Sequence, residues 1–421
     1  MKVALLSTND IRGGAAVVTL RLTEALRRAG VETTMVCARI DDTGNPLVAD
    51  AGNPRLYQAA FLAERLQIFA HNGFDRRDLF KTDTARFGLP LDRHPVVRAA
   101  DVVVLTWVNQ GLISLGTIQK IAREKPVVWI MHDMWPVTGV CHHAGTCMGY
   151  TGTCRDCPML WPRGCNSLAA RVLAAKRETA RECGIHFVAV SSWLGDKAAR
   201  STIAAQSARS VIPNPFPVER YALAPAFSRA DLGLPADGKI VMMAAARLDD
   251  DIKGFPLAVE ALNRLDTGAT GKVTALFAGD LRDPHLLDSL QLPYVHTGAV
   301  TDPARMHSLY CAADVVISSS HYETLPTTLI EGQAAGAVPV AFDSGGQRDI
   351  IEHGVTGWLA PAGDTAALAD GISRALGGTI STETLRASVT ARFSAPAVAQ
   401  QYIALFHKLL RRGNATNPKK S

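Results

Sequence analysis

The chain has 421 residues, 47% of them hydrophobic and 20% charged, and a formal net charge of +5. This is the composition of an ordinary globular protein, and at about 100 to 200 residues per domain the length predicts two domains, each with its own core. The small charge gives no reason to expect a nucleic-acid partner, and no apolar run approaches the roughly 18 residues that cross a bilayer. The N-terminus, MKVALLSTND, soon turns polar, so we expect a strand there, no signal peptide and a cytoplasmic protein.

Strands and helices alternate along the chain, which is typical of parallel sheets with helices on both faces. In the first half, Gly13 and Gly14 predict a tight loop before a helix at residues 15–29, and Gly30 predicts where that helix ends. The predicted strands of the first sheet are residues 3–7, 33–37, 102–105, 127–131 and 187–190. We therefore expect an α/β domain here.

A proline-rich segment, IPNP from Ile212, interrupts the pattern and indicates a domain boundary. The N-terminal domain is then residues 1–212 and the C-terminal domain residues 213–392, while the polar tail at 412–421 is predicted to be disordered. The predicted elements of the second half are strands at 240–246, 274–278, 315–318, 338–341 and 358–359, and helices at 255–265 and 395–410.

Two carboxylates flank the start of a predicted helix after the strand at 315–318. Glu323 lies in the loop and Glu331 about one turn into the helix. A helix that opens at the carboxyl end of a parallel strand offers N–H groups to a phosphate, and carboxylates accept hydrogen bonds from sugar hydroxyls. The spacing indicates a nucleotide-sugar site, although two unrelated glutamates would give the same pattern. The predicted donor-binding residues of this segment are Thr324, Leu325, Pro326, Thr327 and Glu331.

The sequence ETLPTTLIEGQAAGAVPVAFDSGGQRDIIEHGVTGWLA, at 323–360, closely resembles retaining glycosyltransferases of family 4, the large E-x7-E family that includes sucrose synthase and many bacterial polysaccharide transferases. The opening VALLSTNDIRGGAA and the central VIPNPF also lie where that family has them. The resemblance implies the GT-B fold, in which two Rossmann-like domains face each other across a cleft, and a last helix, 393–411, that returns to the N-terminal domain. It also implies transfer of a hexose from a nucleotide diphosphate sugar to a hydroxyl group with retention of configuration.

Further donor contacts are expected from two places. Arg247 and Lys253 follow a predicted strand and would neutralise the charge that grows on a departing diphosphate. They lie slightly farther apart than in the family, and a solvated pair beside the acidic turn at 249–251 is the alternative. Gly13 and Gly14 would bring a backbone close to a phosphate or sugar, or would simply form a turn. No D-x-D pair lies between strands where it would hold a metal against the diphosphate, and the acidic run at 249–251 lies beside Arg247 and Lys253, which are already assigned to that charge. We therefore expect catalysis to need no cofactor and no metal.

The first domain supplies the expected acceptor side. His132 follows a strong strand, and the resemblance implies that it hydrogen-bonds the transferred sugar, which makes it a catalytic candidate with Glu323, Arg247 and Lys253. Asp133 is either an acceptor base or the cap of the following turn. Trp107 and Asn109 end another strand, where they line an acceptor pocket or belong to the core.

Five of the eight cysteines fall within residues 141–165. Cys154 and Cys157 form a C-x2-C, the usual half of a structural zinc site. The four predicted ligands are Cys141, Cys147, Cys154 and Cys157, with His142 or His143 as a substitute for one thiolate. Packing of reduced cysteines or a redox disulfide would use the same residues. The loop, after H-D-x-W-P, resembles that of bacterial exopolysaccharide transferases of the colanic-acid type.

The expected acceptor is lipid-linked or a polysaccharide, in bacterial surface-polysaccharide synthesis. Alternatives on the same scaffold are a sugar-nucleotide 2-epimerase, a phosphorylase and a non-catalytic carbohydrate- or nucleotide-binding protein. Residues 61–69 are apolar on one face and precede Arg76, Arg77 and Lys81, so peripheral contact with the inner membrane is a further expectation. A plain surface helix is the alternative.

Overall fold

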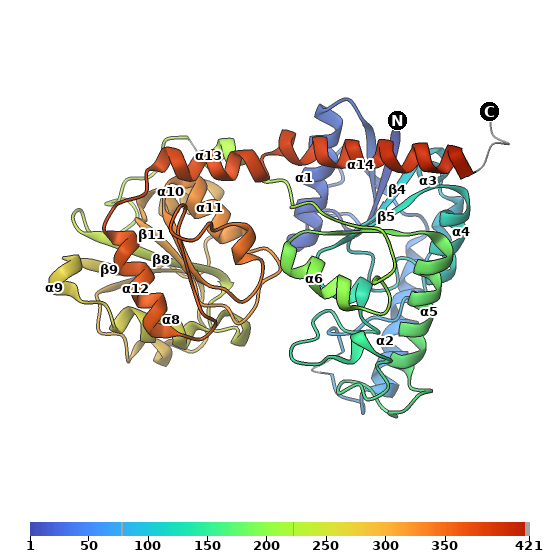
Figure 1. The fold of residues 1–421 in the computed structure, drawn as a ribbon, viewed down its shortest axis with the longest axis horizontal. Coiled ribbons are helices and arrows are strands. Elements are labelled where there is room, and N and C mark those ends of the chain that lie inside the picture. Colours follow the sequence, from blue (N-terminus) through green and yellow to red (C-terminus); the bar gives the residue numbers. More distant parts are fainter. Residues whose placement is uncertain (77–78, 222, 417–421) are drawn as a thin grey trace. The chain divides into compact units, whose positions relative to one another are not determined.

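The computed structural model describes residues 1–76, 79–221 and 223–416, so Arg77 of the basic segment lies outside the described residues. The chain forms two compact units, which Figure 1 shows. Unit 1 contains residues 1–215 and the chain from Val398 onward, and unit 2 contains residues 216–397. From the sequence we expected boundaries after residues 212 and 392.

Unit 1 is built around a parallel sheet with the strand order β3-β2-β1-β4-β5-β6-β7. Its strands are β1 (Lys2–Asn9), β2 (Glu32–Arg39), β3 (Val48–Asp50), β4 (Val102–Leu105), β5 (Val127–Met131), β6 (His186–Ala189) and β7 (Arg209–Val211). Every residue of β4 and β5 is buried, as expected for strands with helices on both faces. The strand order changes direction between β1 and β4. In open parallel sheets, ligands typically bind at the carboxyl ends of the two strands on either side of such a point.

Local sequence explains where the helices of unit 1 begin and end. The Ser167 side chain accepts a hydrogen bond from the Ala170 N–H, and Gly184 ends the same helix in the left-handed conformation. The helices are α1 (Gly14–Arg28), α2 (Pro54–His71), α3 (Pro95–Ala99), α4 (Leu115–Glu124), α5 (Leu168–Cys183) and α6 (Ser192–Arg200).

Unit 2 contains a second parallel sheet with the order β10-β9-β8-β11-β12-β13, which reverses between β8 and β11. Its strands are β8 (Lys239–Arg247), β9 (Val273–Asp280), β10 (Tyr294–His296), β11 (Val315–Ser318), β12 (Val338–Phe342) and β13 (Trp358–Ala360). Its helices are α7 (Val218–Tyr221), α8 (Phe255–Asn263), α9 (Thr267–Thr270), α10 (Pro303–Ala312), α11 (Thr327–Ala335), α12 (Thr365–Leu376) and α13 (Thr382–Phe393).

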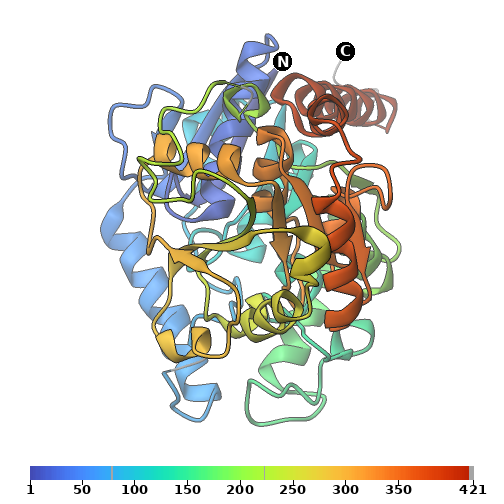
Figure 2. The same cartoon turned by 90° about the vertical axis from the view of Figure 1, so that its left-hand side faces the viewer.

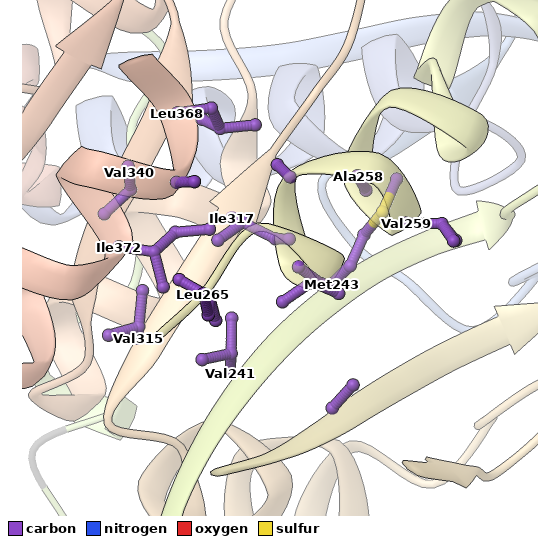
Figure 3. Close-up of a cluster of buried hydrophobic side chains, with 14 of the residues drawn as sticks. Val241, Met243, Ala258, Val259, Leu265, Val315, Ile317, Val340, Leu368 and Ile372 are labelled. Carbon is purple, nitrogen blue, oxygen red and sulfur yellow. The ribbon is translucent and has the colours of Figure 1, made fainter. Parts of the chain in front are cut away.

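The core of unit 2 lies between one face of this sheet and the helices α8 and α12, which contact each other (Figure 2). Val241 and Ile317 point from the sheet toward Ala258 of α8 and Leu368 of α12 (Figure 3). All four side chains are almost fully buried. Burial of this apolar surface stabilises the sheet whose carboxyl edge carries the candidate site.

The prediction of an α/β fold with two Rossmann-like domains is confirmed. The prediction that residues 412–416 belong to a disordered tail is wrong, because helix α14 (Ala395–Thr416) continues through them. Arg411 and Arg412 are good helix formers. Residues 417–421 lie outside the described part of the chain. No described helix is both long and apolar enough to span a membrane.

Candidate functional site

The predicted donor residues of unit 2 lie where its sheet reverses direction. Arg247 is the last residue of β8, and Glu323 follows β11. The two strands are neighbours, with Val315 paired to Val241. Because both strands run the same way, the loops that leave them emerge at the same edge of the sheet.

Lys253 and Glu323 are in direct contact at this edge. The Lys253 ammonium lies 2.5 Å from Glu323 Oε1, and the Ser320 hydroxyl donates to the same oxygen at 3.1 Å. The Ser319 hydroxyl donates to the Lys253 carbonyl at 2.9 Å. Both charged side chains are partly exposed, so a ligand can reach them, and this charge-assisted contact fixes their orientation.

Two glycines allow the backbone around Glu323 to pack closely. A Cβ atom on Gly345 would lie 2.2 Å from the Glu323 carbonyl oxygen, and the next residue, Gly346, donates its N–H to that oxygen at 2.8 Å. Gly254 has a φ of +61°, and a Cβ there would lie 2.3 Å from the Ser319 carbonyl oxygen. Any larger residue at Gly345 or Gly254 would therefore displace the loop that carries Glu323.

Arg247 lies beside this loop with carboxylate partners of its own. Its guanidinium is 3.5 Å from Asp249 and 3.2 Å from Asp250. Burial raises the pKa of Tyr322, and the negative charges of Glu323 and Asp250 raise it further. The turn after Arg247 and the Glu323 loop are linked by the backbone, because the His321 N–H donates to the Ile252 carbonyl at 2.8 Å. The structure brings Lys253 and Glu323 into contact and places Arg247 nearby in an acidic turn.

The start of α11 presents open backbone N–H groups. Pro326 precedes its first residue, Thr327, and no side chain of the cap residue satisfies the first turn. Leu325 and Pro326 are buried and anchor the segment, while Thr324 and Thr327 are half-buried. The proline thus lies one residue before the helix and not inside its first turn.

Glu331 lies on α11, as predicted, and is half-buried. It lies beside Tyr310 of α10. Burial raises the pKa of Tyr310, and the nearby charge of Glu331 raises it further, so the phenol stays protonated. The protonated phenol donates a hydrogen bond to the Glu331 carboxylate, which has further lone pairs that can accept from a diol.

In unit 1, Gly13 and Gly14 lie at the start of α1. Gly13 has a φ of +92°, which favours glycine, and no atom lies within 4 Å of where its Cβ would be. Both glycines are exposed, so the backbone at this helix start is open to a ligand.

His132 directly follows β5. The residue is half-buried, but its Nε2 is enclosed and has no hydrogen-bond partner among the described residues. Burial lowers the pKa of His132 to about 4, although the charge of Asp133 opposes the shift. The imidazole is therefore neutral near pH 7, when it can exchange hydrogen bonds with a sugar hydroxyl but carries no charge.

Asp133 acts within the protein, which favours the capping alternative over an acceptor base. Its Oδ1 accepts the Trp135 N–H at 2.8 Å. Its Oδ2 contacts His142 Nδ1 at 2.7 Å and accepts from Trp107 Nε1 at 3.3 Å. With both oxygens engaged and the side chain buried, Asp133 holds the turn after β5 in place.

His142 belongs to a buried ionic network that the sequence did not indicate. It lies between Asp133 and Asp83, each 2.7 Å from one ring nitrogen. Burial alone would lower the pKa of His142, but the two carboxylates raise it to about 10, so the ring is an imidazolium. Arg65 donates to Asp83 and lies 3.3 Å from Glu64, which completes the network.

The two predicted acceptor-pocket residues differ in their surroundings. Asn109 is buried, and its amide donates to Asp83 at 3.4 Å, so it supports the ionic network and does not line an open pocket. Trp107 is half-buried and stacks on His142, with the ring centres 5.9 Å apart. Of the two, only Trp107 presents part of its side chain to solvent.

The four predicted zinc ligands line one cavity of about 350 Å³. Within the described residues, however, no three His, Cys, Asp or Glu side chains are arranged to hold a metal ion. His142 cannot replace a thiolate, because both of its ring nitrogens are engaged. Burial raises the pKa of Cys141 to about 12 and that of Cys154 to about 11. The four cysteines line the same cavity, but their thiols do not point to a common position where they could bind one metal ion.

Several supporting residues went unpredicted. The sequence could have indicated Ser320 and Gly345, because the SSS run precedes Glu323 and the SGG sequence follows the end of a predicted strand. The sequence could not have indicated Asp83 and Arg65, since their pairing depends on the tertiary structure.

Comparison with known proteins agrees with this geometry. Residues 239–377, which contain Arg247, Lys253, Glu323 and Glu331, match the family model described as glycosyl transferases group 1. Over 373 residues the chain is 24% identical to an Escherichia coli (strain K12) protein named as a colanic acid biosynthesis glycosyl transferase, WcaC. That match covers 84% of this chain and 85% of the relative.

Two solved structures share the fold. Sucrose-phosphate synthase from Thermosynechococcus elongatus superposes with a TM-score of 0.64 at 20% identity, covering 98% of this chain and 100% of that one. HepE from Anabaena, in complex with UDP, superposes with a TM-score of 0.63 at 19% identity, covering 97% and 100%. The expected GT-B fold is therefore confirmed.

Proposed function

Residues 239–377 carry a glycosyl transferases group 1 domain, and on that premise we propose that the protein is a glycosyltransferase that uses a nucleotide diphosphate sugar. The contact between Lys253 and Glu323, beside Arg247 at the carboxyl edge of the second sheet, is the observation that carries this proposal. It combines positive charge for a diphosphate with a carboxylate for a sugar. The neighbour HepE was solved with UDP, which makes a uridine nucleotide the first donor to test.

Each group has a role in this proposal. Arg247 and Lys253 neutralise the charge that develops on the leaving diphosphate. Glu323 accepts hydrogen bonds from the hydroxyls of the moving hexose, and Glu331 accepts from the ribose diol. The start of α11, with Thr324 and Thr327, binds phosphate or sugar oxygens. His132 contributes a neutral hydrogen-bonding group near the reacting carbon.

The proposed reaction retains the configuration at that carbon and uses no metal in catalysis. A leaving diphosphate oxygen accepts the proton of the incoming hydroxyl while the sugar is transferred on the same face. The protein then supplies orientation and charge neutralisation without a covalent intermediate. Retention is inferred from the E-x7-E resemblance, with Glu323 and Glu331 as its two carboxylates.

The proposed acceptor is a lipid-linked sugar or a growing polysaccharide in bacterial exopolysaccharide synthesis, at the cytoplasmic face of the membrane. The name of the 24% identical relative, WcaC, supports this class. A 2-epimerase would use the same donor site but would need no second sugar substrate.

The test uses the full-length protein and a panel of uridine, guanosine and adenosine diphosphate sugars. Release of free nucleoside diphosphate is measured with and without lipid-linked oligosaccharide acceptors. We expect one donor class to be consumed faster when acceptor is added, with a product of retained configuration by NMR. Conversion of the donor into its epimer, or binding without turnover for every donor, would reject the proposal.

A further inference from the structure

Unit 1 has a further cavity, of about 940 Å³, which we call the α5 cavity. It is lined by the second half of α5, the segment 202–208 and Arg412 of α14. Ile185 and Ala208, which also line it, directly precede β6 and β7. Because β5, β6 and β7 run parallel, these amino ends lie at the opposite edge of the sheet from His132, which follows β5. The α5 cavity is therefore separate from the predicted acceptor side.

Most of the charged side chains that line the α5 cavity are basic. Arg177 and Arg181 lie one turn apart on α5, and Arg412 comes from a different helix. Among the described residues that line the cavity, only Glu178 is acidic. Like charges one turn apart on a helix repel each other. A bound anion would relieve this repulsion.

The arginines of α5 are available to a ligand. Arg177 is exposed and makes no hydrogen bond or ion pair with another residue that the structure describes. The guanidinium of Arg181 lies 3.5 Å from Glu182, and both side chains are largely exposed. Such a surface pair contributes little stability, so a ligand can replace it at small cost.

Positive charge also surrounds the start of β6, beside the cavity. Burial lowers the pKa of His186 to about 4, and the charges of Lys408 and Arg412 lower it further. His186 is thus neutral near pH 7. Helix α14, which carries both of these basic residues, contains no acidic residue. The positive charge at this edge of the sheet is therefore not balanced from within α14.

The wall opposite α5 is held in place by hydrogen bonds. The N–H of Thr202 donates to the carbonyl of Tyr150 at 3.2 Å. The guanidinium of Arg209 donates to the carbonyls of Ala205 and Ser207 at 2.8 and 3.0 Å. The segment 202–208 is thereby fixed before any ligand binds, and such pre-organisation lowers the cost of binding.

The α5 cavity also offers apolar surface. Ile185 and Ile203 line it and are almost fully buried, and Ala180 beside them is buried too. A volume of about 940 Å³ lies within the range of sites for small organic molecules. The combination of apolar walls and arginines therefore suits a ligand that has both an organic part and an anionic group.

We propose that the α5 cavity binds an organic phosphate, that is, a phosphate or diphosphate ester of a small molecule. Guanidinium groups bind phosphate oxygens through paired, charge-assisted hydrogen bonds, and Arg177, Arg181 and Arg412 supply three of them. The organic part contacts Ile185 and Ile203. This site lies beyond the proposed function and does not depend on it, because it uses none of the donor-site residues.

The test is calorimetric titration of the full-length Lys253→Met variant, in which binding of a diphosphate at the donor site is weakened. The ligands are uridine diphosphate, glucose 1-phosphate and inorganic pyrophosphate. At least one of the two organic phosphates should bind, and at least about tenfold more tightly than pyrophosphate, because only it gains the apolar contacts. Binding should weaken as salt is raised.

Arginine variants made in the same Lys253→Met protein assign the binding to the α5 cavity. Arg177→Gln and Arg412→Gln should each weaken it about tenfold, because each removes a charge-assisted contact. Arg171→Gln, at an exposed arginine of α5 that does not line the cavity, is the matched control and should change nothing. The thermal unfolding midpoint of each variant shows whether it is folded.

Three outcomes would overturn the proposal. They are no binding of either organic phosphate, binding that Arg177→Gln and Arg412→Gln leave unchanged, and equally tight binding of inorganic pyrophosphate. The last would mean that the arginines attract anions by charge alone. With Lys253 intact, Arg177→Gln should release nucleoside diphosphate from the donor at the wild-type rate, so failure of this proposal leaves the proposed function standing.

Discussion

Lys253 and Glu323, 70 residues apart in the sequence, form a 2.5 Å ion pair at the edge of the second sheet. One carboxylate oxygen of Glu323 is thereby occupied by Lys253 and Ser320. The orientation of Glu323 is set before a donor binds, so the carboxylate need not be reorganised when the sugar arrives. In the proposed reaction, one contact thus couples the diphosphate charge to the group that positions the hexose.

Glu323→Gln should reduce turnover by about 100-fold or more while leaving the fold intact, because it removes the charge that orients the sugar. The side chain is partly exposed, so little stability is lost. Nucleoside diphosphate release and the thermal unfolding midpoint measure the two effects. Glu383→Gln, an exposed change on α13, is the matched control. Normal turnover in Glu323→Gln would remove its assigned role.

Lys253→Met and Glu323→Gln should not act independently. If the two side chains form one functional unit, the double variant should lose about as much activity as the worse single variant. The measurement is kcat/KM for the wild type, the two single variants and the double variant. If the activity loss of the double variant equals the product of the two single losses, Lys253 and Glu323 act independently and the ion pair plays no part in the reaction.

Glu331→Ala should weaken donor binding by about tenfold, with a much smaller effect on kcat, because its proposed partner is the non-reacting ribose. Calorimetric titration with nucleoside diphosphate gives the affinity directly. A drop in kcat with unchanged affinity would contradict the ribose assignment. Glu383→Ala again serves as the comparison.

His132→Asn should change how stability depends on pH. Burial lowers the pKa of His132 to about 4, below its ordinary value of about 6.5. The unfolded chain therefore binds this proton as pH falls below about 6.5, while the folded protein does not until about 4. Wild type should lose up to about 3 kcal/mol relative to His132→Asn across that window.

Denaturant unfolding at pH 7 and pH 4.5 measures this difference. A constant difference between wild type and His132→Asn at both pH values would mean that the histidine titrates normally in the folded protein.

The zinc content of the purified protein tests whether the cysteine-rich loop binds a metal ion. Within the described residues the four thiols do not converge, so protein purified without chelator should hold well below one zinc per chain. Cys154→Ser/Cys157→Ser and Cys165→Ser, which alters an exposed cysteine outside the predicted set, should then have the same metal content as the wild type. About one zinc per chain, lost in Cys154→Ser/Cys157→Ser and kept in Cys165→Ser, would show instead that the predicted cysteines rearrange around a metal ion.

The sequence by itself determined the repeating strands and helices and the positions of Glu323, Glu331 and His132 relative to them. Long buried strands such as β4 and β5 are continuous hydrophobic runs, which makes them visible without a structure. The short strands β3, β7 and β10 were missed, because each has three residues, none of them buried, and so forms no apolar run.

Only the tertiary structure decided which charges meet. Arg65 pairs with Asp83, and His142 lies between Asp83 and Asp133, which gives Asp133 a structural role and removes His142 as a zinc ligand. Hydrophobic periodicity is local and can be read along the chain, whereas a buried ion pair depends on which distant segments the fold brings together.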